Sequence, residues 1–160
     1  MSQELLRFGN WRFRVDRGKT QRYSILEEQG HCLCGYCRNF YAAVDREYPD
    51  LRPFLERFGL SVEAPDELIP YEPTLFYGAY AVSGCMETED EFPICVSGLQ
   101  ITGQNGLDAT VETGMEAPYF VLLIKGIRLP WVLDEPMDDV ISPANEPGFI
   151  RKIINRFLRT

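Results

Sequence analysis

The chain has 160 residues, of which 45% are hydrophobic and 25% charged, and its formal net charge is −8 at pH 7. These values are typical of one folded domain, expected here over residues 1–160, and argue against disorder, a fibrous repeat or several domains. An acidic chain is also a poor candidate for binding the phosphate backbone of nucleic acids.

The N-terminal segment has none of the features of a secretory signal peptide. It contains Glu4, Arg7, Arg12 and Arg14 and lacks a continuous apolar core. The longest apolar run, residues 119–124, is too short to span a bilayer. We therefore expect a cytoplasmic protein that does not associate with membranes and whose cysteines stay reduced.

The first predicted elements are strands. Apolar and basic residues alternate over 11–15, which is the pattern of a half-buried strand. We expect residues 16–19 to form a turn and residues 23–26 to form the partner strand, so that an N-terminal hairpin results.

Two helices are predicted in the centre of the chain. Apolar residues spaced by three and four over 35–48 indicate an amphipathic helix that ends before Pro49. A second helix is expected over 50–59, with Asp50 at its N-cap and Gly59 in a left-handed conformation at its end. Residues 61–73 are rich in proline and acid and predict a loop, with a short helical turn at 66–68.

The second half of the sequence is rich in β-forming residues. Runs bounded by Gly, Asn and Asp occupy residues 75–84, 92–103, 109–114 and 119–133. They predict three or four antiparallel strands, with a turn at 103–106. After an acidic connector, residues 148–160 have the pattern of an amphipathic C-terminal helix. The predicted fold is α+β, with helices packed on one face of a mostly antiparallel sheet.

The segment HCLCGYC, residues 31–37, contains the only histidine and three of the five cysteines. Cys32, Cys34 and Cys37 have a C-x-C-x2-C spacing that can place three thiolates around one ion, and zinc prefers such soft ligands. A structural zinc site needs a fourth ligand. The candidates are His31, Cys85 and Cys95.

Burial without chemistry is the alternative explanation for these cysteines. Free cysteine is one of the most frequently buried residues and packs like a small apolar side chain. Cys37 lies on the apolar side of its predicted helix, and Cys95 lies within a predicted strand. Burial does not account for Cys32 and Cys34, which fall in a predicted loop, and the metal hypothesis depends on them.

The segment Cys34-Gly35-Tyr36-Cys37, at the start of a predicted helix, resembles the active sites of thioredoxin-fold oxidoreductases. The resemblance implies thiol–disulfide exchange, with Cys34 as the nucleophilic thiolate and Cys37 as the resolving sulfur. Residues 72–76, EPTLF, resemble the strand that carries a cis proline facing the sulfurs in that family. The family also has an apolar strand directly before the motif and another between its first helix and the proline, and the sequence predicts neither.

Charge is distributed unevenly along the chain. No Lys or Arg occurs over residues 58–124, where acidic residues are frequent, whereas both ends are basic. Either the ends fold onto the acidic middle, or the middle forms an acidic face that binds a basic protein partner.

The sequence contains no serine-hydrolase elbow, Walker loop or dinucleotide fingerprint. Our first functional hypothesis is a non-enzymatic, accessory or immunity-like module that binds another macromolecule and holds zinc, and our second is a thiol oxidoreductase.

Overall fold

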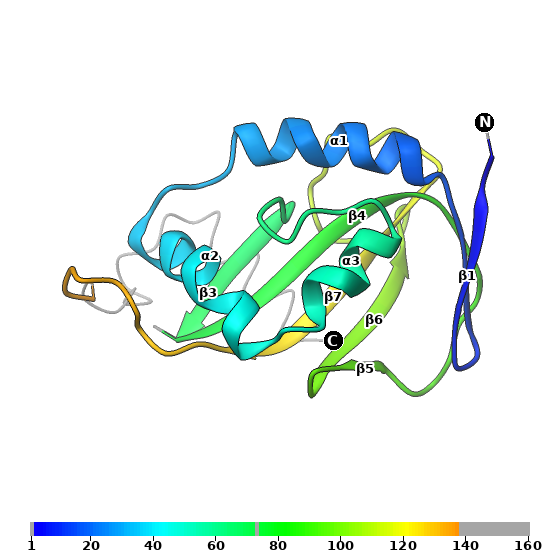
Figure 1. Cartoon of the computed structure of the whole chain (residues 1–160). Coiled ribbons are helices and arrows are strands. Elements are labelled where there is room, and N and C mark those ends of the chain that lie inside the picture. The colour runs from blue at the N-terminus through cyan, green and yellow to red at the C-terminus, as the bar shows by residue number, and fades with distance from the viewer. Residues whose placement is uncertain (1, 73, 138–160) are drawn as a thin grey trace.

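Figure 1 shows the computed structural model, which describes residues 2–72 and 74–137. In chain order the elements are β1 (Glu4–Phe8), β2 (Trp11–Val15), α1 (Arg17–Gln29), α2 (Gly35–Glu47), α3 (Leu51–Arg57), β3 (Glu67–Glu72), β4 (Leu75–Thr88), β5 (Ile94–Val96), β6 (Leu99–Asn105) and β7 (Tyr119–Arg128). The described residues therefore form the predicted α+β fold. The helix predicted over 148–160 lies outside them.

Within the described residues the sheet has seven strands, and every pair of them is antiparallel. Its order is β1-β2-β4-β7-β6-β5, with β3 also paired to β4. β4 is the central strand. One of its edges pairs with β7 and the other pairs with β3 near its start and with β2 near its end.

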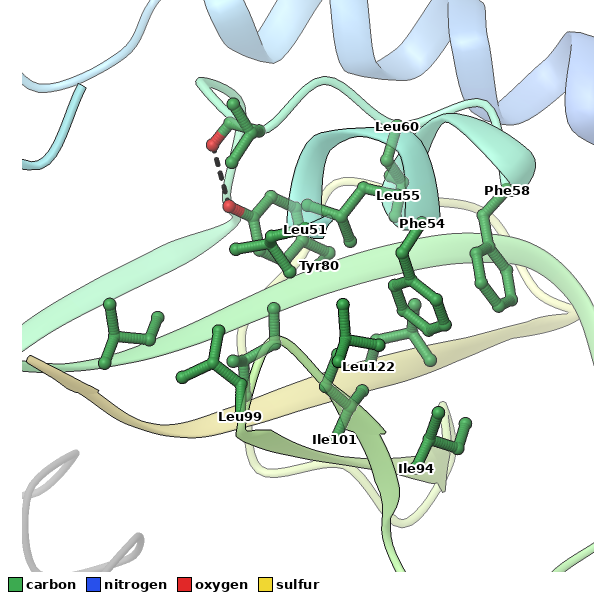
Figure 2. Packing of buried hydrophobic residues seen from close by; sticks show 14 of the residues in the cluster. Leu51, Phe54, Leu55, Phe58, Leu60, Tyr80, Ile94, Leu99, Ile101 and Leu122 are labelled. Atoms are coloured by element: carbon green, nitrogen blue, oxygen red, sulfur yellow. Dashed lines mark hydrogen bonds between the residues drawn. The ribbon is translucent and has the colours of Figure 1, made fainter. Parts of the chain in front are cut away.

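The two faces of the sheet have different partners, because successive residues of a strand point to opposite sides. On one face, Tyr80 of β4 and Leu122 of β7 pack against α3, which contributes Phe54 and Phe58 (Figure 2). On the other face, a smaller cluster forms around Val111 from the segment between β6 and β7. α2 and α3 thus cover one face, as expected for this fold class (Figure 1).

The N-terminal hairpin exists, but its strands differ from the prediction. β1 pairs with β2 through a turn in which Gly9 has a φ of +58°. Residues 16–19 do not form a separate turn: Asp16 caps α1, and its side chain accepts a hydrogen bond from the Lys19 amide at 3.0 Å. Residues 23–26, predicted as a strand, lie within α1.

α1 covers a stretch of the β4 edge that is paired with neither β2 nor β3. The Asp16 amide donates to the Ser83 carbonyl at 2.9 Å, and the Ser83 amide donates to the Thr20 hydroxyl at 3.0 Å. The start of α1 therefore satisfies backbone groups that would otherwise be buried without partners. Since its buried side chains are Thr20 and Ser24, α1 has no apolar stripe by which the sequence could reveal it.

Other predictions are confirmed or corrected in this region. α2 spans nearly the predicted residues, and Gly59 has a φ of +89°, as expected at the end of α3. The Asp50 side chain does not cap α3 and instead accepts a hydrogen bond from the Ser97 hydroxyl at 3.0 Å. Residues 67–72 form β3 rather than a loop with a helical turn, and residues 109–114 cover the sheet instead of joining it.

None of the described helices is long and apolar enough to cross a membrane.

Asp66 joins three segments beside the same edge of β4. Its carboxylate accepts hydrogen bonds from the Tyr23 hydroxyl of α1 and from the Ala81 amide of β4, the latter at 2.6 Å. The Tyr23 hydroxyl also accepts a hydrogen bond from the Gly114 amide at 3.1 Å. Burial raises the pKa of Asp66 to about 6, and the two hydrogen bonds it accepts oppose part of this rise.

We expect Asp66 to make the free energy of unfolding decrease as pH rises. Its pKa is about 6 in the folded state and about 3.9 in an unfolded chain. The folded state therefore binds more protons between these values, and about 3 kcal/mol of stability is lost as pH rises from about 4 to about 6. Urea unfolding at several pH values should show this decrease in the wild type and its absence in Asp66→Asn. Asp108→Asn, at an exposed position, is the control, and equal pH slopes in all three proteins would contradict the expectation.

Candidate functional site

Cys32, Cys34 and Cys37 lie where the chain passes from α1 into α2 (Figure 1). Cys34 is the N-cap residue, with extended backbone angles of φ −64° and ψ 162°, and Cys37 lies in the first turn of α2. The three Sγ atoms are all within 4.8 Å of one another. The structure therefore brings together the three cysteines that the sequence predicted as metal ligands.

The cluster is open to solution on one side and closed by the helix on the other. Cys32 and Cys34 are exposed, whereas Cys37 is buried on the inner face of α2 with Phe40 and Val44. The backbone amide of Cys34 lies 3.5 Å from the Cys32 Sγ and donates to it. Two sulfurs are thus accessible to ions or reagents, and the third is held by packing.

Cys34 and Cys37 differ in their affinity for a proton. The pKa of Cys34 is lowered to about 5, mainly by a hydrogen bond from the Cys37 side chain and also by the backbone amides of Cys37 and Tyr36, while burial opposes part of this decrease. The same hydrogen bond and burial raise the pKa of Cys37. At neutral pH the pair therefore holds one proton, with Cys34 as the thiolate and Cys37 as the donor.

A second layer of side chains surrounds the sulfurs. Tyr41 lies one helical turn after Cys37, and its hydroxyl donates to the Cys32 carbonyl at 3.2 Å. The ring of His31 stacks on the Tyr41 ring, with centroids 4.5 Å apart and planes 16° apart. The His31 Nδ1 lies 3.3 Å from the Glu63 carbonyl oxygen. His31 is thus beside the cluster, although it is not one of the groups within 4.8 Å of one another.

Cys85 and Cys95, the other candidates for a fourth ligand, lie elsewhere in the sheet. Cys85 is in β4 opposite Arg14 of β2, and Cys95 is in β5 opposite Gln100 of β6. Both are exposed and free, and neither belongs to the sulfur group. Of the three predicted candidates, His31 is therefore the one that the fold places next to the cluster.

The surroundings of the CGYC motif differ from those in the thioredoxin fold. A helix, α1, precedes the motif where that family has a strand, and the sheet is antiparallel throughout. β3 does lie between the helices and Pro73, a strand that the sequence did not predict. Pro73 itself, the residue compared with the family's cis proline, lies outside the described residues. The likeness is therefore limited to the four residues and their place at a helix start.

The sequence analysis did not predict that the segment after β7 packs on α2. Asn39, which is fully buried in α2, donates to the Pro130 carbonyl at 3.0 Å and accepts from the Val132 amide at 2.8 Å. Arg38 donates to the Leu33 carbonyl at 2.9 Å and forms an ion pair with Glu135. These contacts fix the cysteine loop to the start of α2. The one available signal was a polar residue, Asn39, on the apolar side of the helix.

The ionised thiol of Cys34 should be selectively alkylated in weakly acidic solution. At pH 6 a thiol with a pKa near 5 is about 300-fold more ionised than one with the usual value near 8.5, and its lower intrinsic nucleophilicity removes about 40-fold, so about a tenfold advantage remains. Peptide mass spectrometry after brief iodoacetamide treatment should therefore find Cys34 labelled before the exposed Cys95. Equal labelling of the two at pH 6 would contradict the assignment of Cys34 as the thiolate.

Comparison with known proteins gives no match to a protein-family model, to a curated protein or to a solved structure.

Proposed function

We propose that this protein is a non-enzymatic binding module that holds a zinc ion at Cys32, Cys34 and Cys37. The observation that supports this proposal is the separation of at most 4.8 Å among the three Sγ atoms. Zinc–sulfur bonds of about 2.3 Å in a tetrahedral site place sulfurs about 3.8 Å apart. Side-chain rotations that bring the sulfurs about 1 Å closer are therefore sufficient for three bonds.

The charges around the sulfurs also suit a cation. Zinc binds thiolates, so a metal site is favoured where thiols lose protons easily. Cys34 has a lowered pKa, and the backbone amides of Tyr36 and Cys37 at the start of α2 favour its ionised sulfur. The Cys34 amide donates a hydrogen bond to the Cys32 Sγ. Hydrogen bonds of this kind, made by groups that do not bind the metal themselves, hold a ligand in position.

His31 is the expected fourth ligand. Metal-binding histidines commonly donate one ring N–H to a backbone carbonyl, which fixes the tautomer and leaves the other nitrogen free to bind. The contact between Nδ1 and the Glu63 carbonyl has this geometry, and under this proposal Nε2 is the nitrogen that binds the metal. His31 precedes Cys32 directly and stacks on Tyr41, whose hydroxyl donates to the Cys32 carbonyl, so it lies beside the site.

The proposed partner is a basic protein. Part of the acidic middle is neutralised by the N-terminal region, through the ion pairs of Arg14 with Glu87 and of Lys19 with Glu116. The connection between β4 and β5 still presents exposed Glu89 and Glu91 next to Phe92, whose exposed fraction is 67%. An exposed aromatic ring with acidic neighbours suits a basic surface. If pull-downs at low salt capture no basic protein, this part of the proposal is wrong.

Elemental analysis tests the zinc proposal directly. The protein should be expressed without a histidine tag, purified without chelators and analysed by inductively coupled plasma mass spectrometry. We expect one zinc per chain, and we expect the apoprotein to take up one equivalent again in a titration followed with a zinc-sensitive dye. A chain that carries no zinc and binds none at micromolar concentration would contradict the proposal.

Thiol–disulfide exchange is the second candidate function, and a separate observation favours it. Cys34 is exposed and has a lowered pKa, whereas Cys37 is buried beside it, so the pair has a nucleophile and a resolving thiol. An insulin-reduction assay with dithiothreitol as the electron source tests this function, with Cys34→Ser as the inactive control. An inactive wild-type protein would rule it out.

A further inference from the structure

We propose that the zinc site is controlled by oxidation: a disulfide between Cys34 and Cys37 forms in response to a peroxide and removes two of the three thiolate ligands. This inference rests on the zinc function proposed above and adds a mode of regulation to the same site. It follows from the arrangement of two cysteines that are separated by two residues at a helix start, whose sulfurs lie within 4.8 Å of each other and are both proposed as metal ligands.

All three sulfurs lie within 4.8 Å of one another, and the place of Cys34 at the N-cap of the helix that holds Cys37 favours this pair for the reaction. Cys34 is exposed and can meet an oxidant in solution, whereas Cys37 is buried and is reached through Cys34. Cys34 lies at the N-cap, outside the regular helix, so its side chain can turn towards the first turn where Cys37 is fixed. The Sγ atoms of Cys34 and Cys37 already lie within 4.8 Å of each other. Cys85 and Cys95 lie in β4 and β5 and take no part.

The reaction transfers two electrons from the sulfurs to the peroxide. The Cys34 thiolate attacks one oxygen of hydrogen peroxide, the O–O bond breaks, and a sulfenic acid forms with release of hydroxide. The Cys37 thiolate then attacks the Cys34 sulfur, the S–S bond forms, and the sulfenic oxygen leaves as a second hydroxide. A dithiol such as dithiothreitol reverses the change by exchange, because it supplies two electrons and becomes a disulfide itself.

Metal affinity should fall steeply in the oxidised protein. Disulfide sulfurs are not thiolates and do not bind zinc in the way that thiolates do. Cys32 would be the remaining thiolate ligand, next to His31. Two ligands do not make the four-coordinate site that structural zinc requires. Oxidation would therefore change both the metal content and the conformation of the exposed loop before α2.

The test measures zinc release and disulfide formation in the same sample. Zinc-loaded protein is treated with increasing amounts of hydrogen peroxide, released zinc is followed with a chromophoric chelator, and cysteines are mapped by non-reducing peptide mass spectrometry. We expect one zinc released for each Cys34–Cys37 disulfide, and rebinding after dithiothreitol. Cys95→Ser should behave as the wild type because this exposed residue is distant from the cluster in the sheet.

Two variants identify the steps. Cys37→Ser should form no disulfide and should accumulate sulfenic acid on Cys34, detected as a dimedone adduct; circular dichroism checks that this buried substitution leaves the fold intact. Cys34→Ser, at an exposed position, removes the thiolate that meets the peroxide, so its Cys37 should stay reduced. Zinc release without this disulfide, or a disulfide formed while zinc stays bound, would overturn the inference and leave the zinc function standing. A protein that binds no zinc before treatment would overturn both.

Discussion

Replacing Cys34 by serine is expected to lower the zinc affinity of the protein by more than 100-fold. Changes to outer-shell partners already cost about 10–100-fold in affinity, and the loss of a thiolate ligand should cost more. Cys32→Ser and Cys37→Ser should have effects of the same order, because all three sulfurs lie within 4.8 Å of one another. Competition with a chromophoric chelator of known affinity measures the change.

The same variants should lose most of the stabilisation that zinc gives to the folded protein. A ligand at about 1,000 times its dissociation constant stabilises the folded state by about 4 kcal/mol. Wild-type protein should therefore unfold at a clearly higher temperature with zinc than without it, and the difference should be much smaller in Cys34→Ser, since a 100-fold lower affinity leaves about 1.4 kcal/mol. Cys95→Ser is the matched control, since it removes an exposed cysteine from β5. Equal zinc affinity in Cys34→Ser and Cys95→Ser would contradict the assignment of the site.

His31→Gln separates the proposed fourth ligand from the three sulfurs. The variant should still bind zinc through its thiolates, with an affinity between those of the wild type and the cysteine variants. Cobalt substitution provides a spectroscopic measure, because the visible bands of the ion depend on its ligands. An unchanged cobalt spectrum in His31→Gln would show that the fourth position is filled by another group, while the three-sulfur site would remain.

Local sequence patterns predicted those parts of the site that are formed by residues close together in the sequence. The spacing of apolar residues located α2, and C-x-C-x2-C placed three sulfurs at its start, because helical geometry brings nearby residues together. The position of His31, the proposed fourth ligand, depends on contacts between distant segments. The Glu63 carbonyl reaches His31 from the segment after α3, and residues 130–132 reach Asn39 from beyond β7. The spacing of apolar residues within one segment does not predict contacts with a distant segment.

The missed elements have a common physical cause. α1 docks through hydroxyl groups and the Tyr23–Asp66 hydrogen bond instead of an apolar stripe, so hydrophobic periodicity did not identify it. β3 contains Pro70, which lowers the strand propensity of its sequence, and it pairs with β4 on one side. Both elements complete the edge of β4. Each is held in place by hydrogen bonds to backbone groups of β4, and the pattern of side chains in the sequence does not indicate these bonds.

Gly84→Ala is expected to be the most destabilising single change in the sheet. Gly84 has a φ of +137°, and a Cβ there would lie 1.9 Å from the Arg14 carbonyl oxygen of β2. The substitution must therefore separate β2 from β4 as well as strain the backbone, and we expect a loss of about 3 kcal/mol or more. Gly98→Ala is the matched control, because Gly98 also has a positive φ of +82° but a Cβ there meets no atom within 4 Å. Its cost should be limited to about 1–2 kcal/mol of backbone strain. Urea unfolding of both variants measures the difference, and equal losses would mean that the close approach of β2 to β4 at Gly84 does not hold in solution.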